Sequence, residues 1–259
     1  MHHFRLHFLA AAASAAFLLA GCETLQGIDT QSLANVGGTA VKAMSLSDGD
    51  IVTMSNESCT AMDGKNKVAA SSSAYVKRLD RVVKGMPATI NGKGADYKVY
   101  LTEDVNAWAM ANGCIRVYSG LMDLMDDDEL RGVIGHEIGH VALGHSKTRM
   151  QTAYAASAAR GLAAATGNSA LKALSESQAG ELAEKFVNAQ FSQSQESAAD
   201  DYSFDLLTER KLERKGLVTS FQKLAKLNEG SASGSSLMSS HPPSAARAAH
   251  MQKRLDKGA

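Results

Sequence analysis

The stretch GHEIGHVALGH, from Gly135 to His145, contains three histidines and one glutamate. On a helix, residues four apart lie about 40° apart around the axis, so His136 and His140 project from one face with Glu137 beside them. This HExxH arrangement presents two imidazoles to zinc and a carboxylate beside the ion's open position. The spacing therefore predicts that His136 and His140 are zinc ligands and that Glu137 is the catalytic base.

A helix around this motif is indicated by its starting residues. Asp126 opens the segment and Glu129 follows three residues later, which is an acidic capping box. The acidic residues before the motif are also favoured by the dipole at a helix N-terminus. The simpler interpretation is two surface histidines on an ordinary helix.

His145 is a tempting third ligand, because one metallopeptidase pattern, HExxHxxGxxH, ends in histidine. That pattern requires glycine at Leu143 and histidine at Ser146, so the spacing fails here. If the helix continues, His145 points about 180° away from His136. We therefore expect His145 to be a packing or hydrogen-bonded histidine.

A third ligand must come from elsewhere, and QESAADDYS, residues 195–203, offers Glu196 and Asp200 four residues apart. On a second helix both carboxylates face the same way. Glu196 can bind zinc, while Asp200 accepts a hydrogen bond from the outer nitrogen of a ligating histidine. The ExxxD pattern alone is common on solvated helix faces, so its weight comes from the HExxH motif upstream.

Length and composition fit one folded domain with a tether. The chain has 259 residues, of which 44% are hydrophobic and 21% charged, and Lys plus Arg balance Asp plus Glu at 27 each. Neutral net charge supplies no field for binding phosphates, so we expect no nucleic-acid partner. The absence of a histidine-rich tract also makes a metal-storage function a weak alternative.

The first residues are typical of an export signal. His2, His3 and Arg5 precede an apolar run over residues 8–19, which is short for a membrane span. The run closes on LAGC at Cys22, which is similar to a bacterial lipobox and predicts cleavage before a lipidated cysteine. An ordinary signal peptide with an incidental cysteine is the alternative.

These boundaries give a signal peptide over residues 1–21, a lipidated tether over 22–44 and a metallopeptidase domain over 45–259. Glu23 follows the cysteine where Asp would favour retention in the inner membrane. We therefore expect the chain to be anchored by lipid to the outer membrane and to face the periplasm.

Cys59 and Cys114 remain as an even pair once Cys22 is lipidated. In an oxidising compartment such a pair predicts a disulfide. Two free thiols or a pair of metal ligands are the alternatives.

Periodicity and turn signals indicate the remaining elements. Helices are expected over residues 47–62, 71–84, 175–212 and 217–227 and after Pro243. Short strands are expected over 97–101, 107–110 and 115–118. Part of the Ala-rich segment 154–174 is expected to be mobile, and the Gly/Ser-rich residues 230–244 are expected to form a flexible loop.

HEIGH followed by ESAAD, with NAWAMANGCIRVYSGLM upstream and SSHPPSAAR near the end, resembles a known zinc metallopeptidase family. This family includes the HtpX heat-shock membrane protease and the CAAX prenyl protease. The resemblance implies a gluzincin-like α+β fold, predominantly α-helical, with a small β-sheet beside the metal-binding helix. It also implies one Zn²⁺ per chain, held by His136, His140 and Glu196, with Glu137 as base and Asp200 behind the ligands.

The resemblance assigns further residues. His241 and Arg247 match the family's HPxxxxR segment, where the histidine is either an inhibitory fourth ligand or an oxyanion stabiliser. The alternative is that His241 is a loop histidine fixed by two prolines, with no role in catalysis. Extended substrates are expected to pair with a strand beside the cleft, formed by Asn106, Ala107, Trp108 and Ala109.

Together these features predict a zinc endopeptidase that cuts unfolded, misfolded or exported envelope proteins. Outer-membrane assembly machinery or a related periplasmic protease is a further expected partner. The alternative is a lipid-anchored chaperone or assembly factor with a latent or structural zinc site. Glu137 favours the enzyme, because a purely structural site does not need that carboxylate.

Overall fold

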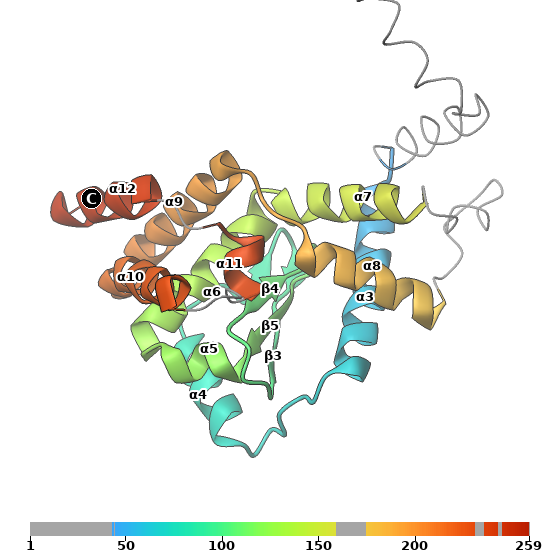
Figure 1. The fold of residues 1–259 in the computed structure, drawn as a ribbon, viewed down its shortest axis with the longest axis horizontal. Helices are drawn as coiled ribbons and strands as arrows, with labels where there is room; N and C mark the ends of the chain where they lie inside the picture. The colour runs from blue at the N-terminus through green and yellow to red at the C-terminus, as the bar shows by residue number, and fades with distance from the viewer. Residues whose placement is uncertain (1–42, 44, 159–174, 231–235, 243–244, 259) are drawn as a thin grey trace, which may run out of the picture. The chain divides into compact units, whose positions relative to one another are not determined.

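The computed structural model describes residues 43, 45–158, 175–230, 236–242 and 245–258 (Figure 1). The predicted signal peptide, Cys22 and all but residue 43 of the predicted tether lie outside them. The described part is mostly helical around a small sheet, so the predicted α+β class is confirmed. The helices are α3 (Asp48–Lys65), α4 (Ala74–Val82), α5 (Ser119–Leu124), α6 (Asp127–Ala142), α7 (His145–Ala158), α8 (Glu176–Asn188), α9 (Gln193–Glu209), α10 (Lys215–Gly230), α11 (Ser236–Ser240) and α12 (Ala245–Asp256).

The main sheet has the order β3-β5-β4. β5 (Cys114–Tyr118) is its central strand, pairing in parallel with β3 (Asp96–Tyr100) and antiparallel with β4 (Ala107–Ala109). All three strands were predicted, and β4 is an edge strand. A hairpin of β1 (Thr89–Ile90) and β2 (Lys93–Gly94) was not predicted, because two-residue strands carry too little pattern.

Helix α6 is the centre of the fold. The Asp126 side chain accepts hydrogen bonds from the backbone amides of Asp128 and Glu129, and the Glu129 side chain accepts one from the Asp126 amide, so the predicted capping box is present. In Figure 1, α6 lies between the sheet and the pair α9 and α10. Contact with α10 is close at Gly132, where an added Cβ would lie 2.8 Å from the Leu217 Cα. α6 is therefore buried along most of its length, and so are its histidines.

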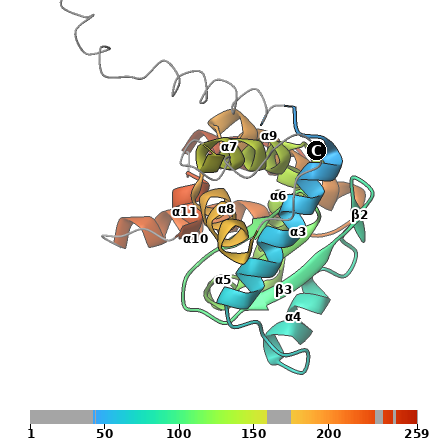
Figure 2. The same ribbon diagram turned by 90° about the vertical axis from the view of Figure 1, so that its right-hand side faces the viewer.

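The two faces of the sheet pack against different helices. Alternate side chains of a strand point to opposite faces, and β4 follows this rule. Ala107 packs in a core shared with Ile134 of α6. Trp108 packs in a second core with Met54 of α3 and Phe186 of α8, and Figure 2 shows α3 and α8 side by side. The metal-binding helix thus rests on a sheet that is covered on both faces.

The segment predicted as one long helix over residues 175–212 is two helices. α8 ends at Asn188, Ala189 is extended, and Ser192 caps α9 with a capping box to Gln195. The local reason is the Ser192 side chain, which accepts a hydrogen bond from the Gln195 amide and starts a new helix. The break leaves Phe191 in a loop.

The metal helix ends at Ala142, since Gly144 adopts a φ of 76°, and α7 starts at His145. α7 makes residues 154–158 of the Ala-rich segment helical. The remainder of the predicted mobile segment, 159–174, lies outside the described residues. The predicted flexible loop over 230–244 instead contains the short helix α11, and the buried His241 directly follows it.

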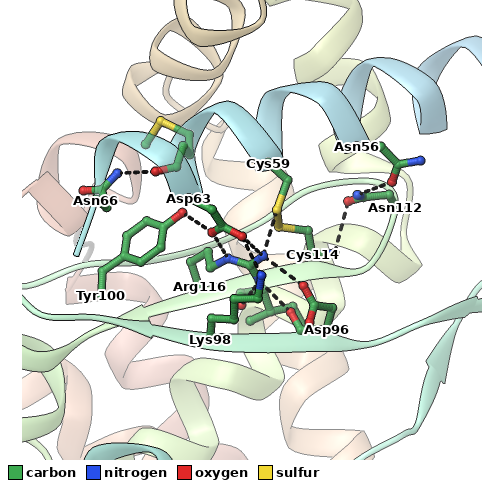
Figure 3. Close-up of a disulfide and its surroundings, with 12 residues drawn as sticks. Asn56, Cys59, Asp63, Asn66, Asp96, Lys98, Tyr100, Asn112, Cys114 and Arg116 are labelled. Atoms are coloured by element: carbon green, nitrogen blue, oxygen red, sulfur yellow. Dashed lines mark hydrogen bonds and ion pairs between the residues drawn. A yellow bond between two sulfur atoms is a disulfide. The ribbon is translucent and has the colours of Figure 1, made fainter. Parts of the chain in front are cut away.

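The disulfide between Cys59 and Cys114 is present and ties α3 to β5 (Figure 3). Beside it the buried Arg116 guanidinium lies 3.0 Å from Cys59 Sγ and donates to the Asp63 carboxylate at 2.8 Å. Asp96 accepts a further hydrogen bond from Arg116 at 2.9 Å. Over the described residues, no helix combines the length and the apolar character needed to cross a bilayer.

Candidate active site

Four side chains from three parts of the chain converge at one buried point. His136 and His140 come from α6, Glu196 from the first turn of α9, and His241 from the residue after α11. One donor atom from each lies within 4.8 Å of the others. The structure thus brings together the three predicted ligands and adds His241 to them.

The spacing of these donors fits a small metal ion. His136 Nε2 lies 3.0 Å from His140 Nε2 and 3.3 Å from His241 Nδ1, and Glu196 Oε1 lies 3.2 Å from His140 Nε2 and 3.0 Å from His241 Nδ1. In a tetrahedral zinc site with bonds of about 2.0–2.1 Å, neighbouring donors are about 3.3–3.4 Å apart. Imidazole nitrogens and a carboxylate oxygen are also donors that zinc prefers.

Asp200 and Arg247 support the donors from behind. Asp200 Oδ1 lies 2.8 Å from His136 Nδ1, as the ExxxD spacing predicts. Arg247 donates from Nε to Asp200 Oδ2 at 2.6 Å, and its Nη1 lies 2.6 Å from Glu196 Oε2. All of these side chains are buried. Burial alone would raise the pKa of Asp200, but the hydrogen bonds from Arg247 and His136 outweigh it and lower the pKa, so Asp200 stays ionised.

Glu137 lies beside the donors and is not one of them. Its side chain is buried, and Oε1 lies 3.4 Å from His241 Nε2. Neither of these two atoms has a hydrogen-bond partner among the described residues. Burial raises the pKa of Glu137 above its ordinary value. A carboxylate with an unmet acceptor and a raised pKa beside a metal-donor set is suited to take a proton from water.

His145 does not point away from His136 as predicted for a continuous helix. The turn at Gly144 brings His145 back, and its Nδ1 lies 3.0 Å from His140 Nδ1. The predicted hydrogen-bonded histidine is therefore found, on the opposite side from the one expected. Burial lowers the pKa of His145, with a smaller contribution from the charge of His136.

Phe191 and Arg149 also adjoin the site, and neither was predicted from the sequence to do so. The Phe191 ring stacks on His140, with centroids 3.7 Å apart and an angle of 13° between the rings. The Arg149 guanidinium lies 4.2 Å from the Phe191 centroid and donates to the backbone carbonyl oxygens of Val187 and Ala189. The break between α8 and α9 is what places Phe191 here.

The predicted substrate strand lies at the sheet edge beside α6. Tyr118 N donates to Asn106 O, and Met110 N donates to Cys114 O, so these alternate residues face β5. By the same alternation Ala107 and Ala109 direct their backbone groups to the outer edge. At one end of this edge Leu237 N of α11 donates to Val105 O at 3.2 Å.

An apolar pocket opens beside Glu137 and His136. α6 and α10 supply most of its wall, and Leu237 of α11, His241 and Arg247 of α12 supply the rest. The apolar lining residues are Val133, Leu217, Phe221, Leu224 and Leu237.

Comparison with known proteins gives concordant matches. The model of peptidase family M48 matches residues 73–255. The chain is 51% identical over 250 residues to Metalloprotease YcaL of Escherichia coli strain K12, covering 96% of this chain and 97% of that protein. It is 50% identical over 251 residues to Metalloprotease LoiP of the same strain, covering 97% of each. A Protease HtpX homolog of Bacillus licheniformis is 35% identical over 74 residues, which are 27% of this chain and 25% of that protein.

Proposed function

This chain belongs to peptidase family M48 and is a metalloprotease, and we propose that it is a zinc-dependent endopeptidase acting on unfolded, misfolded or exported envelope proteins. The observation that carries the zinc proposal is the buried set of donors from His136, His140 and Glu196, with Glu137 beside it. Two imidazoles, one carboxylate and an adjacent free carboxylate are the parts of a hydrolytic zinc site.

Zinc bound by these residues would supply a Lewis acid and would lower the pKa of a bound water toward about 7. The chain's own groups carry the proton. Glu137 takes a proton from the attacking water, whose oxygen bonds to the peptide carbonyl carbon. Glu137 then gives that proton to the leaving amide nitrogen as the C–N bond breaks. Its buried position and raised pKa suit both steps.

His241 closes the site in the described arrangement. Its Nδ1 completes four donors, and structural zinc sites have four protein ligands whereas catalytic ones keep a position open. We infer that this arrangement is a resting state and that the segment of α11 and His241 moves before cleavage. The hydrogen bond from Leu237 N to Val105 O supports this inference, because it places the same segment against the chain just before β4.

We propose the location and partners of the enzyme from features of its sequence. The lipobox at Cys22 supports anchoring to the outer membrane with the domain on the periplasmic side. A disulfide between Cys59 and Cys114 is consistent with an oxidising compartment. Envelope proteins that expose extended, apolar segments are the substrates that an edge strand and an apolar pocket suit. Outer-membrane assembly machinery or a related periplasmic protease is a further proposed partner.

The closed donor set also favours a second function, a lipid-anchored chaperone or assembly factor whose zinc site is latent. One experiment separates the two. The full-length chain and its Glu137→Gln variant are loaded with zinc and incubated with an unfolded protein, and the zinc content of both is measured. Cleavage by the parent alone, with equal zinc in both, supports the peptidase. Equal zinc with no cleavage by either, even when His241→Ala is added, supports the chaperone.

A further inference from the structure

The outer ring nitrogens of the two α6 histidines meet different partners. His136 Nδ1 faces the Asp200 carboxylate at 2.8 Å, whereas His140 Nδ1 faces the imidazole of His145 at 3.0 Å. We propose that His145 is a positioning residue for His140: its Nδ1 accepts the Nδ1–H of His140 and so directs the Nε2 lone pair of His140 to the metal. This inference rests on the proposal that His140 is a zinc ligand.

The backbone holds His145 in place for this contact. Gly144 adopts a φ of 76°, a backbone conformation that residues other than glycine rarely adopt. Its N–H donates to Val141 O at 3.1 Å. On the other side Ser146, buried, donates from Oγ to Ala109 O of β4 at 2.9 Å. His145 therefore lies between two fixed points, one at the end of α6 and one on the edge strand.

The ring of His140 is then constrained in two independent ways. Stacking on Phe191 fixes the plane of the ring, with 3.7 Å between the centroids. Stacking does not select which way the ring is turned within that plane, nor which nitrogen carries the proton. A hydrogen bond at Nδ1 does both, because a histidine that binds a metal through Nε2 must carry its proton on Nδ1.

The proposed role requires one tautomer of His145. To accept at Nδ1, a neutral imidazole must carry its own proton on Nε2. Asparagine places its side-chain oxygen where Nδ1 of histidine lies, whereas glutamine places its amide further out, near the position of Nε2. His145→Asn should therefore keep the acceptor, and His145→Gln should lose it while still filling the space.

The test is the zinc dissociation constant of the full-length chain, measured by competition with a chromophoric chelator. We expect His145→Ala and His145→Gln to weaken zinc binding about 10- to 100-fold, as removal of partners behind metal ligands does elsewhere. His145→Asn should stay close to the parent. His250→Ala is the matched control, because His250 is an exposed histidine paired with Asp201. The visible spectrum of the cobalt-loaded chain should change in the Ala and Gln variants only.

Each outcome separates the possibilities. Equal zinc affinity of His145→Asn and His145→Gln overturns the proposal, because both side chains fill space and only the first keeps the acceptor. If His145→Ala fails to fold, the comparison of His145→Asn with His145→Gln still tests the proposal. Parent-like affinity in all three variants overturns the positioning role alone. A parent chain that binds no zinc overturns the zinc assignment itself, and with it any such role for His145.

Discussion

His241 occupies the space in front of Glu137, with its Nε2 3.4 Å from Glu137 Oε1. A water that Glu137 deprotonates needs this space, and a substrate carbonyl must approach from the same side. His241 also contributes Nδ1 to the donor set, 3.0 Å from Glu196 Oε1. One side chain therefore contacts Glu137 through one ring nitrogen and the donor set through the other.

We expect His241→Ala to raise kcat/KM for an unfolded protein substrate severalfold while zinc stays bound by His136, His140 and Glu196. The reason is that three protein ligands leave the fourth position open. Initial rates with zinc content measured in parallel check this, with His250→Ala as the control. A loss of activity at unchanged zinc would instead assign His241 to stabilising the oxyanion, the alternative that the family resemblance left open.

Arg247 should matter for stability as well as for the site. It is buried and holds two buried carboxylates, Asp200 at 2.6 Å and Glu196 at 2.6 Å. Removing one partner of a buried ion pair typically costs about 3–5 kcal/mol, because the other charge stays buried and unpaired. Arg247→Ala should lower the free energy of unfolding in urea by about that much.

Arg254 provides the comparison on the same helix. It pairs with Asp201 and Asp205, whose side chains are 42% and 67% exposed. Such pairs are worth about 0–1 kcal/mol. Arg254→Ala should therefore have a much smaller effect on unfolding than Arg247→Ala, and equal effects would show that Arg247 acts only through general packing.

The motifs that sequence predicts here are those whose meaning is local. The spacing of His136 and His140 fixes a shared face on any helix, and Asp126 with Glu129 fixes where that helix begins. Glu196 and Asp200 gained meaning only from the HExxH motif, yet they meet it as expected. The spacing of motifs could not point to His241 and Arg247, which lie far along the chain; the family resemblance did.

What sequence missed depends on single turns. From the sequence Gly144 could lie within a continuing helix, since an isolated glycine is tolerated there at some cost in stability. Its positive φ instead ends the helix and places His145 against His140. Ser192 is an unremarkable polar residue until its side chain caps α9. That cap leaves Phe191 in a loop, where it stacks on His140. Contacts of this kind depend on tertiary packing, which helical periodicity does not encode.

The disulfide should contribute strongly to stability. Cys59 and Cys114 are 55 residues apart, and closing a loop of that size is worth about 4 kcal/mol in the chain-entropy model. We expect Cys59→Ser with Cys114→Ser, or full reduction, to lower the melting temperature. Thiol counting establishes that reduction is complete. An unchanged melting temperature in fully reduced protein would mean that α3 is held to β5 by the Arg116 cluster alone (Figure 3).

That cluster also predicts how stability depends on pH. Burial alone would raise the pKa of Asp63, but hydrogen bonds from Arg116, Lys98 and Tyr100 outweigh it and lower the pKa from 3.8 to about 2. A carboxyl group with a lowered folded pKa stabilises the fold above its unfolded pKa, near 3.8. This stabilisation is lost as the pH falls from about 4 through about 2, and it amounts to about 2 kcal/mol.

Asp63→Asn removes this contribution, so the difference in unfolding free energy between parent and variant should stay constant from about pH 7 to about pH 5 and shrink as the pH falls from about 4 toward about 2. Urea unfolding at several pH values measures it. Asp80→Asn, which changes an exposed carboxylate on α4, is the control and should track the parent throughout. A difference that stays constant with pH would mean that Asp63 acts through the shape of its hydrogen bonds to Arg116 and Tyr100 and not through its charge.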